Sequence, residues 1–195
     1  MKLDKVKKSR KFFVLGLSFF LLASVLNAQK NRLEFHANFF YPSEKSVRDI
    51  YRSGVFYRLD LSTHLWRRLE LHLDYGYFTQ KGKLTFTKER TRIWLNPIGV
   101  SLRYVYLQKT INLYAGGGIT YNTFRELNPI GETNQSKVGL MLNTGGFIRL
   151  KGFQKVLKSF IIGVHLNYNY CEMKPADIKF DSGGFDIGLT FGVEF

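Results

Sequence analysis

The sequence predicts an all-β fold, an eight-stranded antiparallel transmembrane β-barrel of the up-and-down type that follows a cleaved signal peptide. Three observations favour this fold class. Segments of strand length carry apolar residues at every second position, the connections between them alternate between short and long, and charges occupy only one register. Outer-membrane barrels combine these features because one face of each strand contacts lipid and the other faces a polar lumen.

Residues 1–28 have the composition of a secretory signal peptide. A basic stretch precedes the apolar run 12–26, and Ala28 is a small residue before the expected cleavage position. An uncleaved helical anchor is the alternative, but the run is shorter than the roughly 20 residues that a helical span needs. We therefore expect residues 1–28 to be removed and residues 29–195 to form the outer-membrane barrel domain.

Composition narrows the classes of partner. The chain has a formal net charge of +14 and stays basic without residues 1–28. An exported protein seldom meets nucleic acid, so anionic lipid head groups are the expected counter-charge. The single cysteine, Cys171, excludes an internal disulfide, and we assign it no role.

Eight candidate strands follow from the alternation and the turn residues. Short connections join the second strand to the third, the fourth to the fifth and the sixth to the seventh. Longer connections are expected at 42–53, 80–91, 125–136 and 172–183. Short turns in the periplasm and longer loops outside the cell are typical of outer-membrane barrels, and an even strand count leaves both termini periplasmic. The predicted strands are 33–41, 54–65, 68–79, 92–107, 110–124, 137–150, 158–171 and 184–195.

The two registers of these strands differ in charge. The apolar register carries none, as the last strand illustrates with Phe185, Ile187 and Leu189. A charge at the bilayer midplane costs about 2–4 kcal/mol, so the charged register should face the lumen. A soluble sandwich or a lipocalin would show the same split with its apolar face inward, but the signal peptide, the connection lengths and the aromatic placement favour a membrane barrel. The charged register holds Glu34, Arg58, Asp60, Arg68, Glu70, Asp74, Arg103, Arg149, Asp186 and Glu194.

Aromatic residues cluster by height along the predicted strands. Such girdles are typical of the two membrane interfaces. In the fourth strand the alternation changes phase at Pro97, which predicts a β-bulge there. The expected outer girdle is Tyr41, Tyr57, Tyr75, Tyr77, Tyr121, Tyr168 and Tyr170, and the expected periplasmic girdle is Trp66, Tyr104, Tyr106, Phe160 and Phe195.

Four stretches resemble the small outer-membrane β-barrel family, which is similar in architecture to OmpA and OmpX. They are Leu69 to Lys83, Ile93 to Tyr104, Ile111 to Asn122 and the terminal GLTFGVEF. The "porin family" barrels of the Bacteroidetes, including PorT-like proteins, are the nearer resemblance. The resemblance implies that Phe191, Val193 and Phe195 form a C-terminal signal for the barrel-assembly machinery.

No catalytic motif is present, and no spacing of ligands supports a metal site or a cofactor. All four histidines, His36, His64, His72 and His165, fall in the lumen register, where polar residues of every kind gather. An eight-stranded barrel is just wide enough for its own side chains, so we expect the lumen charges to pair and fill it. An ion path through them is the alternative. The expected lumen ionic network is Glu34, Arg58, Asp60, Glu70, Asp74, Arg103, Arg149 and Glu194.

The loop 80–92 is strongly basic and is expected outside the cell. It would contact lipid phosphates or a protein partner, or remain a solvated loop. We therefore expect a non-enzymatic barrel with a structural or interaction role: membrane stabilisation, or the membrane subunit of an envelope or secretion assembly with a periplasmic or envelope partner. A narrow porin-like channel for small solutes or ions is the alternative. The basic residues of this loop are Lys81, Lys83, Lys88, Arg90 and Arg92.

Overall fold

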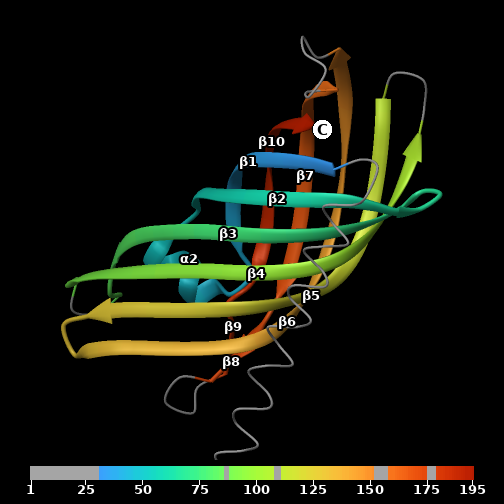
Figure 1. The fold of residues 1–195 in the computed structure, drawn as a ribbon. Coiled ribbons are helices and arrows are strands. Elements are labelled where there is room, and N and C mark those ends of the chain that lie inside the picture. Colours follow the sequence, from blue (N-terminus) through green and yellow to red (C-terminus); the bar gives the residue numbers. More distant parts are fainter. Residues whose placement is uncertain (1–30, 86–87, 108–110, 152–157, 175–178) are drawn as a thin grey trace, which may run out of the picture.

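The computed structural model describes residues 31–85, 88–107, 111–151, 158–174 and 179–195, and the predicted signal peptide lies outside this part of the chain. Eight antiparallel strands close into a barrel in the order β1-β10-β7-β6-β5-β4-β3-β2, which confirms the predicted fold class (Figure 1). The barrel strands are β1 (Asn31–Pro42), β2 (Gly54–Trp66), β3 (Leu69–Lys83), β4 (Arg90–Leu107), β5 (Ile111–Asn128), β6 (Gly131–Lys151), β7 (Ser159–Tyr170) and β10 (Gly184–Glu194).

The first and last strands close the ring. β1 pairs with β10 from Arg32 opposite Glu194 to Pro42 opposite Gly184, and it pairs with β2 on its other side. Every barrel strand therefore has two neighbours, and the sheet has no open edge. Backbone hydrogen bonds join Asn31 and Phe195 in both directions, at 3.1 and 3.0 Å. We name this end of the barrel the terminal end and the opposite end the loop end.

The loop end carries the remaining elements. Helix α2 (Lys45–Tyr51) lies between β1 and β2, and a small hairpin of β8 (Glu172–Met173) and β9 (Phe180–Asp181) lies between β7 and β10. Among the described residues, the structure contains no helix with the length and apolar character of a membrane span.

The outer face of the barrel is apolar, as the alternation predicts. Leu142 on β6, Ile187 on β10 and Val164 on β7 are each more than half exposed. Exposed rings lie near both ends, for example Tyr57 and Tyr77, which are paired across β2 and β3, and Trp66 at the terminal end. A water-soluble protein would not leave a continuous belt of this kind uncovered.

Two of the four long loops are shorter than predicted because the strands extend past them. The predicted loop 80–91 is reduced to 84–89, and the predicted loop 125–136 is a tight turn between β5 and β6. In that turn the side-chain oxygen of Asn128 accepts hydrogen bonds from the backbone N–H groups of Ile130 and Gly131. Gly131 has a φ of 155°, which glycine adopts more readily than other residues.

The predicted β-bulge at Pro97 is absent. Pairing with β5 continues in one register through Pro97, opposite Asn122, and Ile98, opposite Tyr121. Ile93 and Leu95 remain on the inner face and are buried. In the sequence the apolar residues change register at this point because the inner face itself becomes apolar near the loop end. The described irregularity lies in β2 instead, between His64 and Trp66.

The interior is layered along the barrel axis. At the loop end an apolar cluster, named here the apolar plug, fills the lumen, and α2 packs on it through Val47 and Tyr51. A smaller apolar cluster lies near the terminal end. Charged and polar side chains occupy the midsection between them. The plug consists of Phe40, Val47, Tyr51, Phe56, Phe78, Ile93, Leu95, Phe124, Cys171 and Met173, and the smaller cluster of Val105, Tyr114, Phe147 and Ile161.

Candidate functional site

The midsection of the lumen is organised by three buried arginines, each of which contacts two carboxylates. Arg58 on β2 lies 2.8 Å from Asp74 on β3 and 2.7 Å from Asp186 on β10. Asn38 and Asn167 donate further hydrogen bonds to Asp186. The network therefore connects five strands of the barrel wall, β1, β2, β3, β7 and β10, through Asp186 and Arg58.

The second half of the network lies closer to the terminal end. Arg32 on β1 contacts Glu34 at 3.0 Å and Glu70 at 2.8 Å. Arg103 on β4 reaches Glu34 and Asp60, both at 3.5 Å. Arg103 has no exposed surface, and glycine at position 116 leaves room for it, since a Cβ there would press on the Cγ of Arg103. Burial is tolerable for these charges because each has an ionic partner.

Most of the predicted ionic network meets in one place. Glu34, Arg58, Asp60, Glu70, Asp74 and Arg103 all belong to the midsection. Arg149 and Glu194 instead form a separate pair, 2.8 Å long, at the terminal end, where the Arg149 side chain is 31% exposed. Arg68, predicted to face the lumen, is exposed at the turn after β2 and donates to the Tyr104 hydroxyl.

The ionic network predicted from the sequence omits two residues that belong to the network in the structure. Asp186 stands in the charged register but was not assigned to the network, although it accepts two hydrogen bonds from Arg58. Arg32 lies just before the predicted start of the first strand. Its position two residues before Glu34, in the same register, was the available signal.

A small cavity adjoins the midsection. A cavity of about 10 Å³ lies between the network and the apolar plug, lined among others by Phe56 and Arg58. That volume has room for about one water molecule. Asp60 and His36 are at most 1% exposed.

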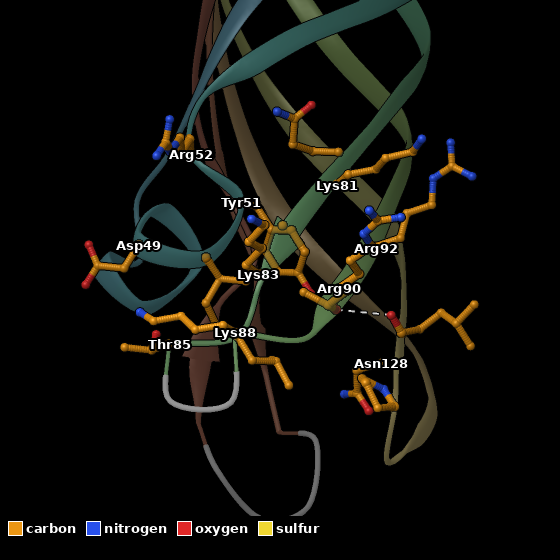
Figure 2. Close-up of a pocket in the computed structure, with 17 residues that line it drawn as sticks. Asp49, Tyr51, Arg52, Lys81, Lys83, Thr85, Lys88, Arg90, Arg92 and Asn128 are labelled. Carbon is orange, nitrogen blue, oxygen red and sulfur yellow. Dashed lines mark hydrogen bonds between the residues drawn. The ribbon is translucent and has the colours of Figure 1, made fainter.

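A second candidate site is a basic cleft at the loop end, with a volume of about 1210 Å³ (Figure 2). All five basic residues of the predicted extracellular loop line the cleft, and Arg52, which follows α2, lines it as well. Asp49 is the acidic residue among the lining side chains. The cationic residues of the basic cleft are Arg52, Lys81, Lys83, Lys88, Arg90 and Arg92.

The basic cleft places like charges opposite each other on neighbouring strands. Lys81 on β3 is the cross-strand partner of Arg92 on β4, and Lys83 is the partner of Arg90. Like charges in directly opposed positions destabilise a sheet. An anion in the cleft would relieve this repulsion.

The floor of the basic cleft is fixed by a buried tyrosine. The Tyr51 hydroxyl donates to Glu126 at 2.6 Å and lies 2.7 Å from the Thr91 hydroxyl. Burial, and then the hydrogen bond to Glu126, raise the pKa of Tyr51. The phenol therefore stays a donor, and it anchors α2 to β4 and β5.

The remaining predicted residues lie at the two ends. Phe191 and Phe195 are exposed on the outer face of β10 and just after it, with Val193 in the same register near the terminal end. Cys171 is buried in the apolar plug, and burial raises the pKa of its thiol. A thiol of this kind is poorly reactive.

No protein-family model and no curated protein matches the sequence. Solved structures of outer-membrane barrels do match. The chain is similar to OprG from Pseudomonas aeruginosa, with a TM-score of 0.65 and 14% identity over 86% of this chain and 96% of that one. It is similar to the N-terminal β-barrel domain of Pseudomonas aeruginosa OprF, with a TM-score of 0.57 and 14% identity over 86% and 98% of the two chains.

A further similar structure is that of Ail, the attachment invasion locus protein of Yersinia pestis, solved in complex with the heparin analogue sucrose octasulfate. Its TM-score is 0.55, with 12% identity over 85% of this chain and 98% of that chain. At these identities the likeness establishes the fold, that of the small outer-membrane β-barrels with OmpA-like or OmpX-like architecture.

Proposed function

We propose that the protein is an integral outer-membrane barrel with a closed lumen and a structural or interaction role. The observation that carries this proposal is the layered interior. Paired charges fill the midsection, and an apolar plug lies between them and the loop end. An ion would have to displace both layers, which argues against a porin-like channel.

The proposed location is the outer membrane, with the loop end outside the cell and both termini in the periplasm. The exposed apolar face of the strands and the aromatic rings near both ends support insertion in a bilayer. Similarity to outer-membrane barrels supports the choice of membrane. The proposed role is binding rather than catalysis, since the charged groups of the midsection are buried.

The proposed ligand of the basic cleft is an anionic group, in the first place the phosphate of an outer-membrane lipid head group. Cations from three chain segments line it, and two cross-strand pairs carry like charges. The structure of Ail with a polysulfated sugar shows a barrel of this fold together with a polyanion. Binding of this kind would stabilise the membrane around the barrel, or hold the barrel within an envelope assembly.

Single-channel recording in a planar bilayer tests the closed lumen. The protein is first shown to be folded by the difference in gel mobility between unboiled and boiled samples. We expect the folded barrel to give no discrete conductance steps. An open porin added afterwards to the same bilayer should conduct, which controls for the bilayer. Reproducible steps from the folded barrel would instead establish the channel function.

A further inference from the structure

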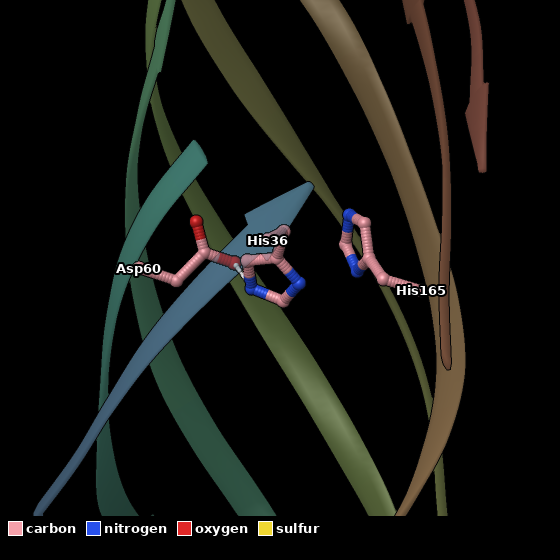
Figure 3. Close-up of side chains that lie close together, drawn as sticks. All are labelled: His36, Asp60 and His165. Atoms are coloured by element: carbon pink, nitrogen blue, oxygen red, sulfur yellow. Dashed lines mark ion pairs between the residues drawn. The ribbon is translucent and has the colours of Figure 1, made fainter. Parts of the chain in front are cut away.

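Two histidines and an aspartate meet in the midsection of the lumen, on three different strands. His36 on β1, Asp60 on β2 and His165 on β7 each offer one potential ligand atom, and these atoms lie within 4.8 Å of one another (Figure 3). The Nε2 atom of His36 is 2.7 Å from Asp60 Oδ2. His72 on β3 approaches the same carboxylate oxygen with its Nε2 atom, at 3.3 Å.

The two imidazole rings of this group are oriented by hydroxyl groups. The Nδ1 atom of His36 is 2.8 Å from the Thr190 hydroxyl, and the Nδ1 atom of His165 is 2.8 Å from the Tyr114 hydroxyl. Each ring therefore directs its Nε2 atom into the group, where that of His36 meets the Asp60 carboxylate. Among the described residues the buried Nε2 atom of His165 has no hydrogen-bond partner. Metal-binding histidines are held in the same way, with the second nitrogen fixed by a hydrogen bond.

The buried charges of the midsection do not balance. Leaving aside the separate Arg149–Glu194 pair, the described residues place three arginines and five carboxylates there. With His36, His72 and His165 counted as neutral, the excess is two negative charges on side chains that are at most 8% exposed. Buried charges are tolerated only when they are compensated. The arginines are Arg32, Arg58 and Arg103, and the carboxylates are Glu34, Asp60, Glu70, Asp74 and Asp186.

We propose that His36, Asp60 and His165 bind one divalent transition-metal ion of the zinc class inside the lumen. The ion would supply the two missing positive charges, and its ligands would be the two imidazoles and the carboxylate. Nitrogen donors of this kind select zinc and its neighbours, whereas calcium and magnesium prefer oxygen ligands. The site goes beyond the proposed membrane role, and it would act as a cross-link between β1, β2 and β7.

Sequence spacing gives no sign of this site because each ligand comes from a different strand. The residues are brought together by the pairing of β1 with β2 and by barrel closure, which pairs β1 with β10 and so leaves only β10 between β1 and β7. The apolar clusters at both ends imply that the ion enters while the barrel folds. It should then be protected from chelators in the folded protein.

The test measures metal content in the folded protein without a polyhistidine tag. The protein is extracted in detergent from membranes of cells supplied with Zn²⁺, and also refolded from urea with Zn²⁺. Both samples are washed with EDTA to remove surface metal before elemental analysis. The variants are His165→Gln and His36→Gln, and the matched control is His64→Gln, since His64 lies outside the group and is only half-buried.

We expect about one zinc ion per chain in the wild type and the control, and at least about a tenfold lower content in the two variants. Refolding with Co²⁺ should give the ligand-field absorption of a tetrahedral site in the wild type, which keeps the test decisive if a variant does not fold. If the folded wild type holds no EDTA-resistant metal in either preparation, the proposal is overturned. Bound protons would then neutralise the excess negative charge. Equal metal in the wild type and in folded His165→Gln would also overturn it.

Discussion

Arg58 on β2 and Asp186 on β10 form a buried ion pair, with 2.7 Å between Nη2 and Oδ2, that passes over the inner face of β1. Because β1 lies between these two strands, the pair spans the junction at which the first and last strands close the ring. The side chains are at most 2% exposed. This contact links barrel closure to the charged midsection.

Replacing Arg58 by alanine should strongly destabilise the barrel. The change leaves Asp74 and Asp186 without their guanidinium partner, and breaking a buried pair costs about 3–5 kcal/mol. The free energy of unfolding is measured by urea titration in detergent, with tryptophan fluorescence as the signal. The matched control is Arg125→Ala, which removes an exposed pair with Glu132 and should cost at most about 1 kcal/mol. Equal losses in the two variants would contradict the structural role of Arg58.

Truncating the apolar plug should destabilise the barrel without opening it. Phe78 is fully buried, and Phe78→Ala should lower the free energy of unfolding by about 3–5 kcal/mol. The control, Phe35→Ala, removes a ring from the outer face, where lipid or detergent can fill the space. We expect the folded Phe78→Ala barrel to remain silent in planar bilayers, because the ionic network is intact. Conductance in this variant would show that the plug alone closes the lumen.

The fold was predictable because every strand repeats the same physical division between its faces. Leu189 and Asp186 illustrate it: an apolar side chain turned outward and a carboxylate turned into the lumen. The prediction failed where the inner face is not polar. Ile93 and Leu95 make the sequence pattern change register. Alternation cannot distinguish an apolar residue that faces lipid from one that faces an apolar layer of the lumen.

The candidate sites were predictable only in part, since they depend on which strands meet. The basic residues of 80–92 are local in sequence, so their clustering was foreseen, but Arg52 reaches the cleft from another segment. The contact between His36 and His165, with ring centroids 4.5 Å apart, joins the first and seventh barrel strands along the chain. No local spacing encodes such a contact.

Tyr51→Phe should change how stability depends on alkaline pH. Burial raises the pKa of Tyr51 in the folded protein above that of an exposed tyrosine, so the folded state holds this proton more tightly than the unfolded state. The contribution is fully present below the ordinary tyrosine pKa of about 10 and is lost as pH rises above it. Urea titrations at pH 8 and at about pH 11 should therefore show a smaller loss of stability in Tyr51→Phe than in the wild type. The same alkaline loss in both proteins would contradict the assignment.

Reversing two charges of the basic cleft should weaken binding of anionic lipid. In the double variant Lys81→Glu, Arg92→Glu, one cross-strand pair of cations becomes a pair of anions. The measurement is the rise in melting temperature when anionic lipid replaces zwitterionic lipid in mixed micelles. We expect the rise to be reduced in this variant and, in the wild type, to shrink with added salt. Lys137→Glu, an exposed charge change outside the cleft, is the control and should keep the rise.

Replacing Phe195 by alanine should impair assembly more than stability. The backbone of Phe195 already pairs with Asn31, and its side chain is 38% exposed on the outside of the barrel, so the ring contributes little to packing. If the terminal ring serves as an assembly signal, folded protein in the outer membrane should fall several-fold, while the purified variant refolds in detergent with an unchanged urea midpoint. Leu189→Ala, in the same register of β10 but away from the terminus, is the control and should assemble normally. A parallel loss of assembly and of refolding stability in Phe195→Ala would show that the ring acts through packing and not as a recognition signal.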